Sequence, residues 1–126
     1  PENEKMKDRI IRTFNLDEKR GLTMMRENGF GRTAAQTAKF LLNTGGLNRE
    51  MIGRALGSFT DERGIEALRL FAEGVEMEGM PFLLSLRRFL QKFKLPGESQ
   101  MVDRILEAFS HAYCKANPND FSSPSI

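Results

Sequence analysis

Apolar residues recur along the chain at intervals of three and four positions, which is the period of an α-helix. The clearest stripe would occupy one face of a helix that begins at Thr60 or Asp61 and ends at Gly79. Its residues are Ile65, Leu68, Ala72 and Val75. Valine and isoleucine are few, and no segment alternates polar and β-branched residues between tight turns, as strands do. The pattern predicts an all-α protein.

The most periodic run follows Pro81, which fits a first helical position because its missing N–H breaks no hydrogen bond there. Its apolar face, about three turns long, consists of Phe82, Leu86, Phe89, Leu90 and Phe93. The helix should end before Pro96, because the residue before a proline avoids the helical region. Ser99 begins a last helix that closes at Asn117 and whose apolar face consists of Val102, Ile105, Leu106, Phe109 and Tyr113.

Side chains that cap helices precede the other apolar runs. Asp17 and Asn48 are predicted N-caps, and Thr33 with Gln36 three positions later forms a capping-box pattern. Gly57 is predicted to end the helix that Asn48 begins, since a residue without Cβ adopts a positive φ easily. With a further short helix before Asp17, about seven short helices are expected.

Length and composition place these helices in one domain. The 126 residues suit a single core, and 40% hydrophobic with 29% charged residues is ordinary for a globular protein. The lone Cys114 cannot form an internal disulfide, which favours a reducing compartment such as the cytoplasm. No apolar run approaches the roughly 18 to 20 residues that span a bilayer, and no signal peptide is evident. Because the chain opens with Pro1 and not Met, it is expected to be part of a longer protein.

Catalytic and metal-binding motifs do not emerge from the sequence. His111 stands alone, without a second histidine at metal-ligand spacing or a nucleophile motif nearby, and is interpreted as a partly exposed helix residue. A single cysteine cannot build a thiolate zinc site. We therefore expect neither a metal nor a cofactor.

Basic residues raise the question of nucleic acid or lipid as a partner. Nineteen basic and seventeen acidic side chains leave a charge of only +2, which supplies little attraction for phosphate backbones. Residues 33–57 have the outline of a helix-turn-helix with Asn48, Arg49 and Arg54 as base readers, but the break at 43–47 is too long for one. One predicted helix carries a basic cluster, which consists of Arg87, Arg88, Lys92 and Lys94. We interpret this cluster as the solvated outer face of the helix and not as a binding site for an acidic partner or a lipid surface. No nucleic-acid partner is expected.

The turn at 95–99 carries the best candidate for a functional side chain. Glu98 would lie at a helix N-terminus, where a negative charge is stabilised by about 0.3 to 1 kcal/mol. The same turn also projects a carboxylate that could disturb a phosphate and a magnesium ion brought against it. The residues alone leave both interpretations open.

The segment Phe93-Lys94-Leu95-Pro96-Gly97-Glu98-Ser99-Gln100, followed by Asp103-Arg104, resembles the first motif of the Sec7 domain, the module with which Arf guanine nucleotide exchange factors act. Other similar segments are Phe40-Leu41, Gly46-Leu47-Asn48, Ile52-Gly53, Leu56-Gly57, Phe89-Leu90 and Tyr113-Cys114. The resemblance runs from about Ile11 to Ser123 and implies a right-handed stack of helices, the first part of an α-superhelix. The family's second motif, of Asn-Thr-Asp-Leu-His-Asn type, does not occur in residues 1–126, so a partial domain is expected.

The resemblance implies a mechanism and a set of contacts. Glu98 is the expected glutamic finger, which repels the β-phosphate of GDP, competes for Mg²⁺ and pairs with a phosphate-binding lysine of an Arf-family GTPase in its GDP-bound form. Leu95, Pro96, Gly97 and Gln100 support the finger. The expected GTPase contacts are Asp103, Arg104, Phe82, Leu86, Phe89, Phe93, Met101, Ile105 and Phe109.

Two expectations follow for the chain by itself. Met101 occupies a position where lysine is common in the family, which removes a positive charge beside the finger and would shift partner preference. Without the second motif, weak or no exchange is expected, and Phe82, Leu86, Phe89, Ile105 and Phe109 would be partly uncovered. The alternative function is then a non-catalytic interaction module that self-associates. Recruitment to membranes is expected from other parts of the full protein.

Overall fold

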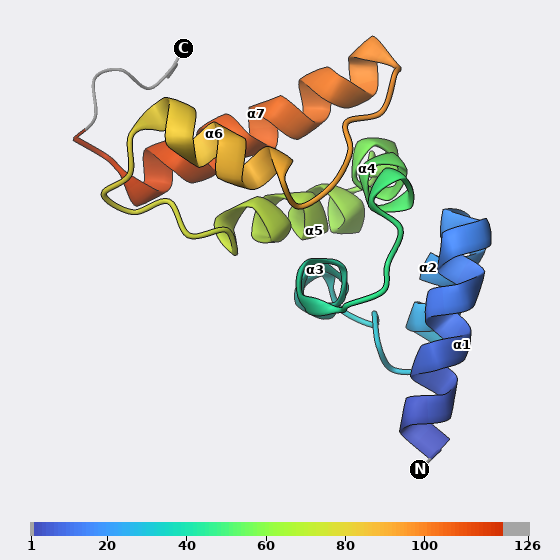
Figure 1. Ribbon diagram of the computed structural model, residues 1–126. Helices are drawn as coiled ribbons and strands as arrows, with labels where there is room; N and C mark the ends of the chain where they lie inside the picture. Colours follow the sequence, from blue (N-terminus) through green and yellow to red (C-terminus); the bar gives the residue numbers. More distant parts are fainter. Residues whose placement is uncertain (1, 120–126) are drawn as a thin grey trace.

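Residues 2–119 are described by the computed structural model, and they form seven helices and no strand (Figure 1). The helices are α1 (Glu2–Leu16), α2 (Glu18–Glu27), α3 (Ala34–Asn43), α4 (Arg49–Ser58), α5 (Glu62–Glu73), α6 (Phe82–Leu90) and α7 (Ser99–Ala116). The all-α prediction is confirmed. None of the helices in this part of the chain is long and apolar enough to cross a membrane.

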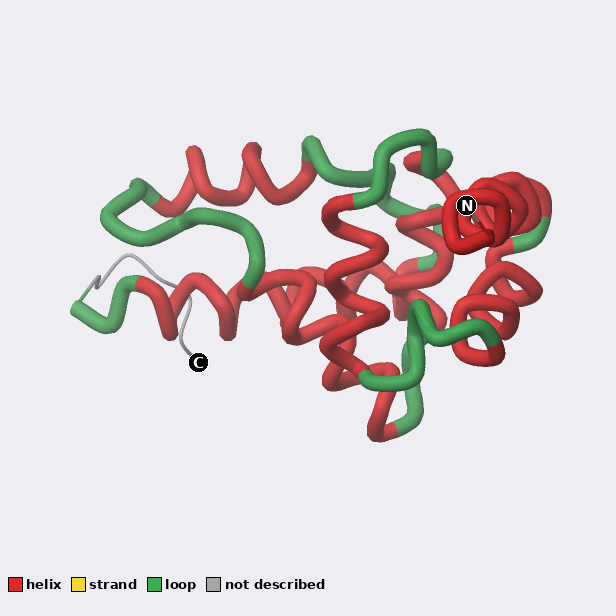
Figure 2. The backbone as a smooth tube through the Cα atoms, turned by 90° about the horizontal axis from the view of Figure 1, so that it is seen from below, coloured by secondary structure: helices red, strands yellow, loops and turns green. Residues whose placement is uncertain are grey.

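The helices pack around α5, which contacts α3 on one side and α7 on the other. The antiparallel pair α1 and α2 joins this group through α4, because α4 contacts both α2 and α7. Helix α6 packs on α7 and is flanked by loops at 74–81 and 91–98 (Figure 2). The second of these loops contains the candidate motif.

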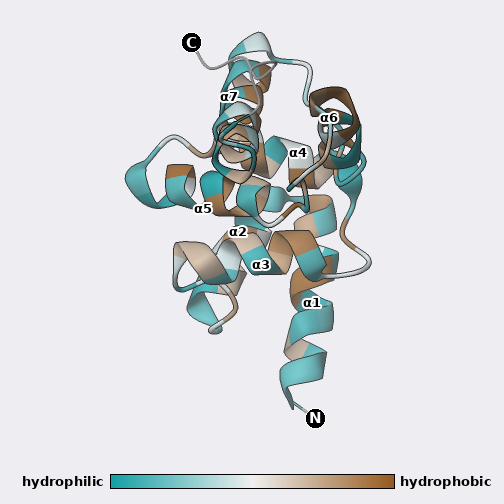
Figure 3. Ribbon diagram, turned by 90° about the vertical axis from the view of Figure 1, so that its left-hand side faces the viewer, coloured by the Kyte–Doolittle hydropathy of each residue, from teal (hydrophilic) through white to brown (hydrophobic). Residues whose placement is uncertain are grey.

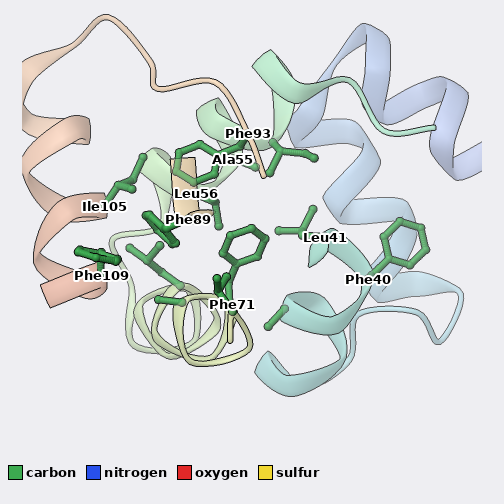
Figure 4. Packing of buried hydrophobic residues seen from close by; sticks show 14 of the residues in the cluster. Phe40, Leu41, Ala55, Leu56, Phe71, Phe89, Phe93, Ile105 and Phe109 are labelled. Atoms are coloured by element: carbon green, nitrogen blue, oxygen red, sulfur yellow. The ribbon is translucent and has the colours of Figure 1, made fainter. Parts of the chain in front are cut away.

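Aromatic side chains fill the core where α4, α5, α6 and α7 meet (Figure 4). Phe71 of α5 is fully buried and makes edge-to-face contacts with Phe89 and Phe93, with ring centroids 6.3 and 6.1 Å apart. Phe109 of α7 continues the cluster at 5.1 Å from Phe89. Such pairs add about 0.5 to 1.5 kcal/mol each beyond the burial of apolar area. The segment around Phe93 is therefore part of the core.

The helix starts predicted at Asp17, Thr33, Asn48 and Asp61 are confirmed. Asp17 accepts hydrogen bonds from the amides of the next helix, as do Thr33, Asn48 and Asp61 at their own helices. The capping box differs in one bond, because the Gln36 side chain accepts from the Arg32 amide at 2.8 Å instead of from Thr33. Helix starts depend on local contacts, so the sequence suffices to locate them.

Several predicted helix ends are wrong. Gly57 lies inside α4 without a positive φ, and α5 ends at Glu73 while Gly79 adopts its φ of +73° in the following loop. Val75 is buried from that loop, whereas Ile65, predicted to face the core, is 50% exposed. Tertiary packing decides where these helices end, because apolar residues of the loops, such as Val75, are buried in the core and fix the position of the loop.

The helix predicted for the run behind Pro81 is also shorter than expected. Pro81 precedes α6 as its N-cap, and α6 ends at Leu90. Phe93 thus belongs to the loop and still reaches the core at 1% exposure. The apolar period continued past the end of the helix because the loop packs on the same core.

Ser85 of α6 is fully buried, and its hydroxyl has no hydrogen-bond partner among the described residues. A buried hydroxyl without a partner is destabilising by about 1 to 3 kcal/mol. Ser85→Ala is therefore expected to raise the free energy of unfolding by about 1 kcal/mol, measured by urea denaturation. Ser58→Ala is the matched control, because the Ser58 hydroxyl donates to the Ala55 carbonyl at 2.9 Å and its loss should be destabilising. A destabilised Ser85→Ala would show that the hydroxyl is satisfied.

Candidate functional site

The loop between α6 and α7 begins by fastening onto the first turn of α4 (Figure 1). The Lys94 amide donates to the Arg49 carbonyl at 3.1 Å. The Arg49 guanidinium donates in return to the carbonyls of Phe93 at 3.0 Å and Leu90 at 3.3 Å. One residue of α4 thus holds both the end of α6 and the start of the loop.

Gly53, one turn after Arg49, lets the loop backbone lie directly on α4. A Cβ at Gly53 would overlap the carbonyl oxygen of Lys94, well inside the 3.0 Å that real Cβ contacts keep, and would lie 3.5 Å from the Phe93 ring. The obstacle is backbone and not a flexible side-chain tip. Glycine is required here for close approach and not for a special φ.

Gly57 likewise permits close approach at the other end of the loop, where α7 begins. A Cβ there would lie 2.7 Å from the Met101 Cβ, in the first turn of α7. The Arg104 guanidinium donates a hydrogen bond to the Gly57 carbonyl. Since Gly53 and Gly57 are four residues apart, they share one face of α4. This face supports both ends of the loop.

Glu98 lies at the N-cap position of α7 with an extended backbone, φ −83° and ψ 127°. Its side chain is exposed and makes no capping hydrogen bond. Most N-cap side chains use their oxygen to satisfy the first free amides of a helix, as Asp17, Asn48 and Asp61 do. The Glu98 carboxylate is held at the start of a helix without being used by it.

Gly97 needs no left-handed conformation in this structure, because it is not among the described glycines with positive φ. A Cβ at Gly97 would have no neighbour within 4 Å. The turn itself therefore does not require glycine at this position. This differs from Gly53 and Gly57, whose neighbours exclude a side chain.

The predicted contact residues separate into three groups by exposure. Gly97, Glu98, Gln100 and Asp103 are exposed, and Leu95, Pro96, Met101, Arg104, Phe82 and Leu86 are half-buried. Phe89, Phe93, Ile105 and Phe109 are at most 1% exposed. These four fill the core, so a partner cannot touch them in this conformation.

The expectation that Phe89, Ile105 and Phe109 are partly uncovered is wrong. Phe82 covers the end of this cluster, with its ring centroid 5.5 Å from that of Phe109 and 5.1 Å from that of Tyr113. The large apolar side chains that do reach the surface of α6 are Leu83 and Leu84, at 74% and 48% exposure, and much of α6 is brown in Figure 3. Neither of these two side chains was among the expected contact residues.

The sequence did not predict that Arg49, Gly53 and Gly57 support the loop; Arg49 was considered only as a base reader and Gly57 only as a helix end. A signal was present, because Gly53 lies within the predicted helix and Gly57 lies four residues later at its predicted end. Each glycine in a helix is unfavourable by about 1 kcal/mol relative to alanine. Two of them on one face indicate that another backbone or side chain approaches closely.

Taken together, the geometry defines a class of protein: a helical domain that presents an acidic side chain from a loop seated on a glycine face. The family model described as "Sec7 domain" matches residues 3–125. The chain belongs to the Sec7 domain family.

Relatives and solved structures agree with this assignment. The chain is 38% identical to brefeldin A-inhibited guanine nucleotide-exchange protein 3 of Arabidopsis thaliana, over 90% of this chain and 6% of that protein. It is 40% identical to human cytohesin-3, over 87% of this chain and 28% of that protein. The chain therefore spans less than a third of either relative.

The Sec7p catalytic domain superposes with a TM-score of 0.80 and 33% identity, covering 91% of this chain and 64% of that one. A Sec7 domain solved with ARF1-GDP and brefeldin A has a TM-score of 0.73 and 37% identity, covering 85% of this chain and 55% of that one. The fold of residues 2–119 is that of part of a Sec7 domain.

Proposed function

We propose that this chain is the finger-bearing part of an exchange domain that promotes GDP release from an Arf-family small GTPase, with Glu98 as the glutamic finger. The carrying observation is an exposed carboxylate that makes no capping hydrogen bond, on a loop fastened at both ends to α4. A relative named as a guanine nucleotide-exchange protein and a Sec7 domain solved with ARF1-GDP support the reaction and the partner.

The Glu98 carboxylate acts by charge. Brought into the nucleotide site, it repels the β-phosphate, competes with that phosphate for Mg²⁺ and pairs with the phosphate-binding lysine. Two unit charges 4 Å apart interact by about 4 kcal/mol at an effective dielectric constant of 20. No covalent bond forms or breaks, so the protein acts by making the nucleotide-bound state less stable.

The seating of the loop contributes to this action. A carboxylate on a free loop would lose conformational entropy each time it entered the nucleotide site. The hydrogen bonds from Arg49 and Arg104 hold the loop ends before the partner arrives. The finger is therefore presented in an ordered position.

Partner contacts come from the exposed and half-buried residues around the finger. Asp103 is exposed on α7 and can pair with a basic residue of the GTPase switch region. Leu95 and Met101 are half-buried beside it and supply apolar contact. The buried aromatic residues do not contact the partner but support the residues that form this surface. In the full protein, which we place in the cytoplasm, other segments recruit the domain to membranes.

Gly97 provides a test of partner approach that is separate from folding. Because the structure leaves room for a Cβ at Gly97, Gly97→Ala should change the free energy of unfolding by less than about 0.5 kcal/mol. A GTPase backbone that passes close to Gly97 would be displaced by the methyl group, so we expect an increase in KM for Arf–GDP. The measurement is the dependence of GDP release on Arf concentration. An unchanged KM would show that nothing approaches this residue.

The proposed function is tested by the release of labelled GDP from an Arf protein, with the full-length protein that carries this chain. Wild type is compared with Glu98→Lys and with no added exchange factor. Release that is no faster with wild type than without it would refute the function. Equal acceleration by wild type and Glu98→Lys would refute the role of Glu98.

A further inference from the structure

A surface cavity of about 210 Å³ lies between α2 and the start of α5, and Gly31, Thr37 of α3, and Ser58 and Phe59 at the end of α4 complete its lining. None of residues 93–104 lines it. It is therefore distinct from the exchange loop, and the proposed function does not use it.

The charge around this cavity is positive. Lys19 and Arg26 on α2 and Arg63 on α5 line it, and none of them forms an ion pair with another described residue. Asp61 is the one carboxylate in the lining, and it accepts the Gly64 amide at 2.7 Å as the N-cap of α5. Three cations against one anion leave two positive charges for which the cavity provides no partner.

The remaining walls divide between apolar groups and hydroxyls. Leu22, Phe59 and Ala67 give an apolar surface. The hydroxyls already donate to backbone carbonyls; they are Thr23 to Lys19 at 3.1 Å, Thr37 to Gly31 at 3.4 Å and Ser58 to Ala55 at 2.9 Å. The cations are exposed, so their donors face solvent and are the side-chain groups of the lining that a bound anion can reach.

We propose that this cavity binds a phosphate monoester attached to a small apolar group. A phosphate carries up to two negative charges and three acceptor oxygens, which matches the uncompensated charge, and arginine binds it through paired N–H donors. The apolar surface accepts the group that bears the ester. The volume is below the roughly 300 to 1,000 Å³ of drug-sized sites, so the bound part is small. A lipid head group and a soluble ester share this chemistry.

The test is isothermal titration calorimetry of the full chain with two probes, phenyl phosphate and dihexanoyl phosphatidate below its micelle concentration. We expect saturable binding of at least one probe, weakened by added salt. Binding of phenyl phosphate alone identifies a soluble ester as the ligand, and binding of phosphatidate alone identifies a lipid head group. Failure of both probes to bind would overturn the proposal.

Variants locate the binding. The double variant Arg26→Ala/Arg63→Ala should weaken it by about a hundredfold or more, because each removed cation accounts for about a factor of ten. Arg20→Ala is the matched control, since Arg20 is exposed on the same helix as Arg26 but does not line the cavity, and it should change affinity less than twofold. Equal affinities of the double variant and wild type, or an equal loss with Arg20→Ala, would overturn the proposal. Circular dichroism checks that each variant is folded. The readout is ligand affinity and not GDP release, so the result does not depend on the proposed exchange function.

Discussion

Glu98→Lys in the full-length protein is expected to lower the rate constant of GDP release at saturating Arf by about 10²- to 10³-fold, the usual effect of removing one preorganised electrostatic contact. The substitution replaces a charge that repels the β-phosphate with one that attracts it. The lysine also repels Mg²⁺ and the phosphate-binding lysine of the GTPase. Each of these changes stabilises the nucleotide-bound state.

Stability separates this effect from misfolding. Glu98 is exposed and makes no capping hydrogen bond, so its replacement by lysine affects stability only through the charge at the helix N-terminus and should lower the free energy of unfolding by no more than about 2 kcal/mol. Glu107→Lys is the control, because Glu107 is exposed on the same helix and undergoes the same change of charge. It should release GDP at nearly the wild-type rate. Equal losses in both variants would mean that overall charge, and not the finger, determines the rate.

Gly53→Ala is expected to displace the exchange loop from α4. The new Cβ overlaps the Lys94 carbonyl oxygen, and this backbone atom can yield only if the loop moves. Overpacking of this kind is destabilising by about 1 to 3 kcal/mol, which the better helix propensity of alanine offsets by about 1 kcal/mol. A shift of the finger by about 1 Å lowers the exchange rate by up to about 10²-fold.

Both quantities are measurable on the same protein, the stability by urea denaturation and the exchange rate by release of labelled GDP. Gly45→Ala is the control, because Gly45 has no neighbour within 4 Å of a Cβ and no positive φ. It should leave stability and exchange near wild type. A Gly53→Ala variant with unchanged exchange would show that the seat of the loop on α4 does not position the finger.

The sequence by itself determined the class of fold and located the motif around Glu98. Helix starts at Asp17, Thr33 and Asn48 depend on contacts with the next few residues, so a local reading located them. The apolar period likewise predicted that every element is helical. The motif around Glu98 is continuous along the chain, and its resemblance to the Sec7 domain could be recognised without coordinates.

Only the tertiary structure decided how the loop is held and which side chains a partner can reach. Arg49 and Gly53 precede the loop by some forty residues, and their contacts with Phe93 and Lys94 exist only in the folded chain. Neither the apolar period nor the resemblance distinguishes a side chain buried in the core from one exposed at the surface. Phe89 and Phe109 proved to be core residues, because α5 and α6 cover them. Burial depends on contacts between distant segments, which a local pattern cannot contain.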